Sequence, residues 1–291
     1  MRKSAWAIAI LWVFLLACER PEIDRDENIG SGPGADTVDK DTGGNDTSEQ
    51  DSEIEKQVKL ILGNMTLADK VDQMAGPLTG DIFSTPDNPI VNVRGFKFRD
   101  GPRGVRLLDD GTTTCFPVAV ARAATWEFDL EKRVGRAIGL ETKGLGHNVI
   151  LAPTVNTLRH PGHGRAQESY GEDPWLLGHM GIAFTEGAQE HVAACVKHLA
   201  GNNIEDTRMT NNAVMDEQTL RENYLRQFKM VVEETDVACV MSAYNKVNDF
   251  YCSENSHLLR DILKGEWNFT GFVVSDWFAA KSTAESANAG L

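Results

Sequence analysis

Apolar and polar residues alternate with two different periods along this chain of 291 residues. Short apolar runs rich in β-branched residues predict buried strands, and apolar residues that recur every three or four positions predict helices. The predicted strands cover residues 91–98, 116–121, 147–152, 193–199, 237–242 and 271–275. The predicted helices cover residues 58–65, 130–144, 176–190, 216–232 and 258–267, and another helix is expected after an N-cap at Thr66.

Strands separated by helices of this length indicate right-handed crossovers and a parallel sheet. Six such units predict an α/β fold, a TIM-like (β/α) barrel with the helices outside. A closed barrel needs about eight strands, and the chain stops soon after the sixth, so we expect the barrel to be incomplete at the C-terminus. An open doubly wound sheet is the alternative, although no GxGxxG pattern follows the first predicted strand.

The N-terminus has the layout of an export signal. Arg2 and Lys3 precede an apolar run that ends in Leu15-Leu16-Ala17-Cys18, which resembles the lipobox of bacterial lipoproteins. We therefore expect residues 1–17 to be a signal peptide and Cys18 to carry lipid; the alternative is an ordinary signal peptide that contains a cysteine. The expected location is the periplasmic or cell-surface side, with an outer-membrane anchor because Glu19 follows the cysteine.

Residues 18–57 are rich in acidic and small polar residues and nearly lack large apolar ones, which predicts a disordered acidic linker. The folded domain is then expected over residues 58–291. The formal net charge of −14 argues against nucleic-acid binding, which requires a basic face.

The remaining cysteines are Cys115, Cys195, Cys239 and Cys252. Cys195 and Cys239 lie inside predicted strands and are expected to be buried, but the sequence does not settle any disulfide pairing. No CxxC spacing or histidine cluster accompanies them, so we expect no metal and no cofactor.

Polar residues follow almost every predicted strand, where a core would exclude them. At the carboxyl ends of parallel strands they would meet at one mouth of the barrel. Carboxylates, amides and cationic side chains can hold sugar hydroxyls, and an aromatic ring can cover the apolar face of a sugar. These residues are Asp100, Arg159, Arg165, Glu168, Lys197, His198, Asn202, Asn203, Arg208, Ser242, Tyr244, Asn245, Asp276 and Trp277.

Asp276 follows the last predicted strand and is the candidate catalytic carboxylate, kept ionised by nearby lysine and arginine side chains. The alternative is that Asp276 caps the helix that comes next, because aspartate is favoured at that position.

Five motifs occur in an order that resembles glycoside hydrolase family 3 of the β-glucosidase type, and the resemblance runs from about Met65 to Leu291. The motifs are Asp100-Gly101-Pro102-Arg103-Gly104, the run over residues 164–174, Lys197-His198, Met241-Ser242-Ala243-Tyr244-Asn245 and Ser275-Asp276-Trp277.

The resemblance implies a retaining, exo-acting β-glucosidase that hydrolyses terminal non-reducing β-D-glucosyl residues through a covalent glycosyl-enzyme on Asp276. The sugar-binding residues that it implies are Asp100, Arg165, Lys197, His198, Arg208, Tyr244 beside the nucleophile, and Trp277 as the aromatic wall.

Retention requires a second carboxyl group as general acid/base, which the resemblance places in a downstream domain. The chain alone is therefore expected to be nearly inactive. Glu168 and Glu172 are expected to fix the loop that presents Arg165 rather than to supply this group.

Two other functions remain open on the sequence. A β-xylosidase of the same family would differ in the contacts around the sixth carbon of the sugar. A surface-tethered sugar-binding module without catalysis would explain the absence of a second catalytic carboxyl group. In each case the partners are a β-linked sugar and, through Cys18, the membrane.

Overall fold

The computed structural model describes residues 47–77, 80–107 and 111–291, and the chain divides into two units, 1–64 and 65–291. The described part of the first unit is helix α2 (Thr47–Asn64), with ion pairs at helical spacing between Glu53 and Lys56 and between Glu55 and Lys59. The last residues of the predicted linker are therefore helical. The predicted signal peptide, Cys18 and the rest of the linker lie outside the described residues.

The second unit contains a five-stranded sheet in the order β1-β2-β3-β5-β8, and every neighbouring pair in it is parallel. The strands are β1 (Phe98–Asp100), β2 (Val149–Leu151), β3 (Ala193–Leu199), β5 (Cys239–Ser242) and β8 (Phe272–Ser275). The TIM-like α/β fold class is thus confirmed. Within the described residues the sheet does not close into a barrel.

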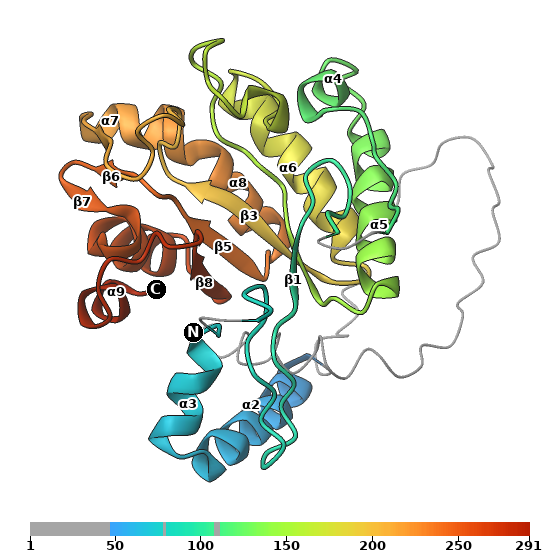
Figure 1. Cartoon of the computed structure of the whole chain (residues 1–291), viewed down its shortest axis with the longest axis vertical. Helices are drawn as coiled ribbons and strands as arrows, with labels where there is room; N and C mark the ends of the chain where they lie inside the picture. Colours follow the sequence, from blue (N-terminus) through green and yellow to red (C-terminus); the bar gives the residue numbers. More distant parts are fainter. Residues whose placement is uncertain (1–46, 78–79, 108–110) are drawn as a thin grey trace, which may run out of the picture. The chain divides into compact units, whose positions relative to one another are not determined.

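Helices α5 (Phe128–Gly144), α6 (Pro174–Ala188) and α8 (Arg226–Thr235) lie side by side along this sheet (Figure 1). Sheet and helices bury one apolar cluster that includes Ile150, Phe184 and Phe228. Helices α5 and α6 cross closely at Gly187, where a Cβ would lie 2.0 Å from the Lys132 carbonyl oxygen. The crossing therefore depends on a residue without a side chain.

Two strand predictions were wrong. Residues 116–121 lead into helix α4 (Ala119–Ala123), because Pro117 has no N–H for a strand ladder and the alanines that follow favour a helix. In residues 91–98 the chain turns at Asn92, which has a φ of 54°, and strand β1 begins only at Phe98. The other predicted strands and helices have counterparts in the structure.

Helix starts follow the expected capping chemistry. Thr66 caps α3 (Leu67–Met74) in a capping box with Asp69. Asp173 caps α6, and Asp216 caps α7 (Glu217–Thr219). Helix α7 continues through the π-helical segment η2 (Leu220–Leu225) into α8.

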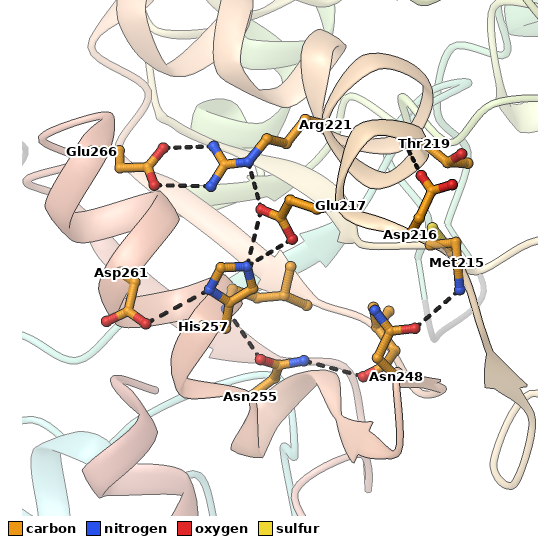
Figure 2. A network of polar contacts seen from close by, with 12 residues as sticks. Met215, Asp216, Glu217, Thr219, Arg221, Asn248, Asn255, His257, Asp261 and Glu266 are labelled. Atoms are coloured by element: carbon orange, nitrogen blue, oxygen red, sulfur yellow. Dashed lines mark hydrogen bonds and ion pairs between the residues drawn. The ribbon is translucent and has the colours of Figure 1, made fainter.

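A surface network joins this helix to η4 (His257–Glu266), as Figure 2 shows. Arg221 donates hydrogen bonds of 2.6 and 2.9 Å to Glu266. His257 lies between Glu217, at 3.0 Å, and Asp261, at 3.7 Å. The remaining short elements are η1 (Ala166–Glu168), β4 (Asn212–Ala213), β6 (Lys246–Val247), β7 (Phe250–Tyr251), η3 (Cys252–Glu254) and α9 (Ala284–Ala289).

Cys195 and Cys239 are buried, as predicted. They face each other on the neighbouring strands β3 and β5, where they form a disulfide. Cys115 is exposed, Cys252 is buried, and both are free. In the ranges that the structure describes, the helices are too short or too polar to cross a bilayer.

Candidate active site

A cavity of about 490 Å³ lies at the carboxyl ends of the parallel strands. Every catalytic and sugar-binding residue that the family resemblance implies lines this cavity, although the residues come from distant parts of the chain. They are Asp100, Arg165, Lys197, His198, Arg208, Tyr244, Asp276 and Trp277.

Strand β3 sends two consecutive side chains, Lys197 and His198, into the cavity. Successive side chains of a regular strand point to opposite faces of the sheet. The register of β3 against β5 shifts between Lys197 and Leu199, and an irregularity of this kind re-aims a side chain. Both residues are 2% exposed, so a lysine and a histidine are held side by side in a site that excludes most water.

Asp100 is bound by cations on two sides. The Lys197 ammonium donates a hydrogen bond of 3.1 Å to Asp100 Oδ1, and Arg106 Nη1 lies 3.9 Å from Oδ2. Burial opposes ionisation of Asp100, but Lys197, Arg165 and Arg106 together outweigh burial and hold the pKa of this carboxyl group below its usual value. Asp100 is therefore an ionised acceptor, suited to receive hydrogen bonds from hydroxyl groups.

Asp276 follows β8 and is 6% exposed. Its Oδ1 accepts a 2.8 Å hydrogen bond from the Trp277 backbone N–H. The helix-capping alternative is not realised, since α9 begins only at Ala284. The other carboxylate oxygen, Oδ2, accepts no hydrogen bond within the described structure, and His198 Nε2 lies 3.6 Å from it.

Burial raises the pKa of Asp276 above its usual value. Lys197, the nearby Tyr244 hydroxyl and Arg165 lower this pKa but do not offset burial. The Tyr244 hydroxyl lies near the carboxyl group but makes no hydrogen bond to Asp276 Oδ2. Lys197 and Arg165 thus favour the ionised carboxylate, in the direction expected from the sequence, but burial of Asp276 in the low dielectric of the site has the larger effect on its pKa. Burial and the nearby Asp276 charge also raise the pKa of Tyr244.

Trp277 forms one wall of the cavity. Its indole Nε1 donates a 3.1 Å hydrogen bond to the Ile82 carbonyl oxygen, and its ring packs against Phe83 with centroids 4.7 Å apart. Phe83 was not predicted, because nothing in the local sequence pattern links its segment to the end of β8.

The arginines are held by acidic neighbours. Arg165 donates two hydrogen bonds to Glu168, of 3.0 and 2.8 Å, so Glu168 holds the guanidinium in place. Arg208 binds Glu205 at 2.9 Å and places its guanidinium 4.3 Å from the centre of the Tyr244 ring. Both arginines therefore have defined positions at the cavity.

Several polar residues that follow strands do not line the cavity. Arg159 packs on the ring of Tyr224 instead, with 5.7 Å between guanidinium and ring centre. Ser242 bonds to Ser253, and Asn245 donates to the Ala200 carbonyl oxygen. The set placed outside the cavity is Arg159, Asn202, Asn203, Ser242 and Asn245.

Asn156 is a buried residue beside the site that was not predicted from the sequence. It follows β2, so the rule that polar residues after strands face the site could have found it. Its side chain binds His198 at three points: Oδ1 accepts from the His198 backbone N–H at 2.9 Å and contacts Nδ1 at 2.8 Å, and Nδ2 donates to the His198 carbonyl oxygen at 2.8 Å.

Comparison with known proteins matches residues 99–290 to the glycosyl hydrolase family 3 N-terminal domain. Beta-glucosidase B of Emericella nidulans is 41% identical over 239 residues, which is 81% of this chain and 28% of that protein. A beta-glucosidase of Rhizobium radiobacter is 44% identical over 236 residues, 79% of this chain and 28% of the relative. This chain thus spans less than a third of the length of these two curated relatives.

The structure of beta-glucosidase 3B from Thermotoga neapolitana, solved in complex with glucose, is similar with a TM-score of 0.75 and 40% identity. The similarity covers 80% of this chain and 36% of that structure. On the family match, the sequence identity and the shared fold, this chain belongs to glycosyl hydrolase family 3, through the N-terminal domain of that family.

Proposed function

We propose that this chain forms the barrel part of a retaining, exo-acting β-glucosidase that removes terminal β-D-glucosyl residues and uses Asp276 as the nucleophile. The observation that carries the proposal is the free oxygen of Asp276. Oδ2 is buried, accepts no hydrogen bond within the described residues and lies in a cavity lined by hydroxyl-binding groups. Relatives named beta-glucosidase, one of them solved with glucose, support the same substrate class.

The reaction begins with attack of Asp276 Oδ2 on the anomeric carbon of the sugar. A carbon–oxygen bond forms to the carboxylate while the bond to the leaving group breaks, and water later releases the sugar. Lys197 and Arg165 stabilise the ionised carboxylate. Trp277 offers a flat apolar surface to the ring, and Asp100 an ionised acceptor to a hydroxyl.

Among the described residues that line the cavity, no second carboxyl group is suited to act as general acid. Asp100 is bound to Lys197 and has a lowered pKa, and Glu168 is occupied by two hydrogen bonds from Arg165. Glu172 is exposed and does not line the cavity. We therefore assign the general acid/base to a group outside the described residues.

The test is to trap the covalent intermediate with a dinitrophenyl 2-deoxy-2-fluoro-β-D-glucoside. Dinitrophenolate leaves without a proton, so the first step does not require the general acid. We expect one fluoroglucosyl group per chain, located by peptide mass spectrometry on Asp276. Asp276→Asn should give no adduct, and Asp261→Asn, on the surface of η4, should label like the unchanged protein.

An adduct on another carboxylate, or labelling of Asp276→Asn at the unchanged rate, would contradict the assignment. The corresponding xyloside separates the two sugar classes. Labelling by the glucoside at least about tenfold faster, equivalent to about 1.4 kcal/mol in the barrier, is expected, and the reverse order would indicate a β-xylosidase. A folded protein that binds glucose and takes up no label would indicate a non-catalytic sugar-binding module.

We also propose that the protein is an exported lipoprotein anchored through Cys18 to the outer membrane. The support is the apolar run that ends in Leu15-Leu16-Ala17-Cys18 and the acidic segment that follows it. Expression in a bacterium fed a clickable fatty acid should label the unchanged protein and leave Cys18→Ala unlabelled. Equal labelling of both would rule out the anchor.

A further inference from the structure

The strongest unexplained feature at the site is the three-point contact between Asn156 and His198. Both residues are buried, with exposures of 3% and 2%. The segment that carries Asn156 runs beside β3, since the Val155 N–H donates to the Lys197 carbonyl oxygen at 2.9 Å. The Ser169 hydroxyl donates to the backbone carbonyl oxygen of Asn156. The backbone thus holds the Asn156 side chain against one partner.

The backbone of His198 fixes which way round the Asn156 amide lies. The His198 N–H can only donate, so the atom it meets at 2.9 Å must be the amide oxygen. The His198 carbonyl oxygen can only accept, so the atom at 2.8 Å from it must be the amide nitrogen. Because His198 Nδ1 lies 2.8 Å from the same amide oxygen, Nδ1 must carry a hydrogen.

The imidazole then carries no hydrogen on Nε2, provided that the ring is neutral. Burial lowers the pKa of His198 well below its usual value, and Arg165, Lys197 and Arg208 lower it further. The charged and titratable groups that face the ring are these three cations, His163 and Asp276. Nε2 is therefore a lone-pair acceptor at neutral pH.

Nε2 lies 3.6 Å from Asp276 Oδ2, an acceptor that no donor in the described structure satisfies. Two acceptors this close, in a buried site, lack the hydrogen that would join them. A hydroxyl group from a ligand can provide it, whereas an acceptor such as fluorine cannot.

We propose that Asn156 is a positioning residue that locks His198 in the tautomer with a bare Nε2, so that a bound sugar must donate a hydroxyl hydrogen there. The inference rests on the proposed function for the identity of the ligand. It assigns to His198 the role of acceptor, and it makes the hydroxyl that His198 binds a determinant of specificity.

The first measurement is the ring tautomer, which does not depend on activity. In protein labelled with ¹⁵N-histidine, long-range ¹⁵N–¹H spectra at pH 7 should show His198 with a protonated Nδ1 and an unprotonated Nε2. Asn156→Ala should lose this single tautomer and give a mixture. Asn148→Ala, which removes an asparagine that holds only the Lys97 N–H and the Gly95 carbonyl oxygen, should leave the His198 signals unchanged.

Asn156→Asp keeps the side-chain shape and tests the same point if Asn156→Ala does not fold. Its carboxylate favours the protonated ring, so an Nε2–H signal should appear at higher pH than in the unchanged protein. An Nε2–H tautomer in the unchanged protein, or the same bare Nε2 in both Asn156 variants, would overturn the inference.

The second measurement is a titration with D-glucose and its 2-, 3-, 4- and 6-deoxyfluoro analogues, followed at His198 Nε2. Glucose should shift this signal, and one analogue should fail to shift it and bind about 3- to 10-fold more weakly. In Asn156→Ala that difference should shrink toward equality. If every analogue that binds shifts Nε2 as glucose does, the specificity role is overturned.

If the tautomer is as stated and no sugar binds, the proposed function fails, and the sugar-binding role of His198 fails with it. If glucose binds and Asn156→Ala keeps both the tautomer and the discrimination, the role of Asn156 fails while the proposed function stands.

Discussion

Lys197 on β3 donates a 3.1 Å hydrogen bond to Asp100 at the end of β1, across the intervening strand β2. The lysine side chain is 2% exposed and the carboxylate side chain 31% exposed, so the pair spans from the buried floor of the cavity toward its opening. The buried ammonium is stabilised by this counter-charge, since an isolated buried charge costs several kcal/mol.

Asp100→Ala should therefore destabilise the fold by about 3 kcal/mol, because it leaves the buried Lys197 ammonium without its carboxylate. The value is at the low end for a broken buried pair because Asp276 still lies near Lys197. Urea unfolding measures the difference. Glu186→Ala is the control, since it breaks the exposed Lys132–Glu186 pair of 2.9 Å and should cost less than about 1 kcal/mol. If both variants lost the same free energy of unfolding, the Asp100–Lys197 pair would stabilise the fold no more than an exposed ion pair does.

His198 should make stability depend on pH. Its pKa is lowered in the folded state from the ordinary 6.5, so below pH 6.5 the unfolded chain binds more protons than the folded one. The contribution of His198 to the free energy of unfolding is therefore fully present above about pH 6.5. It decreases as the pH drops below this value, by up to about 1.4 kcal/mol per pH unit. Urea unfolding between pH 5 and 7 should show a shallower slope in His198→Gln. An identical slope in both proteins would refute the effect.

Glu131 is fully buried, binds Arg122 at 2.7 Å and accepts a 2.7 Å hydrogen bond from the Tyr170 hydroxyl. Glu131→Gln should cost about 3 kcal/mol, because it leaves the guanidinium buried without a counter-charge. Thermal and urea unfolding measure the loss. Glu190→Ala, which removes an exposed pair with Arg136, should cost less than about 1 kcal/mol. A loss below that level for Glu131→Gln would contradict the prediction.

Gly187→Ala should destabilise the crossing of α5 and α6, since the new Cβ would lie 2.0 Å from the Lys132 carbonyl oxygen and the helices would have to separate. We expect a loss of about 1–3 kcal/mol. Gly144→Ala is the matched control at the end of α5, where nothing lies within 4 Å of the new Cβ, and it should be neutral or stabilise by about 0.5–1 kcal/mol. The melting temperature should fall in Gly187→Ala and should stay the same or rise in Gly144→Ala. Equal shifts in the two variants would contradict the close crossing of α5 and α6 at Gly187.

The sequence alone predicted the α/β fold class, the residues of β3 and two helices over 130–144 and 176–190, because apolar periodicity and capping residues act locally. The structure places these helices over 128–144 and 174–188. Polar residues after parallel strands meet at one edge of a sheet, and this rule found most of the polar side chains that line the cavity. The same rule also named Arg159, Asn202, Asn203, Ser242 and Asn245, which lie outside the cavity. The strand expected at 116–121 was wrong, because an apolar run after a proline fits either a strand or a helix, and the local pattern does not distinguish them.

The tertiary structure decided everything that depends on distant segments. It placed Phe83 behind Trp277 and Arg106 beside Asp100, and it turned Asn156 toward His198. It also set the pKa of Asp276, because burial comes from the whole surrounding fold and outweighs the lysine and arginine that the sequence identified. Residue order can specify which groups reach the site, but distances, hydrogen-bond partners and dielectric arise only when the strands and loops pack together.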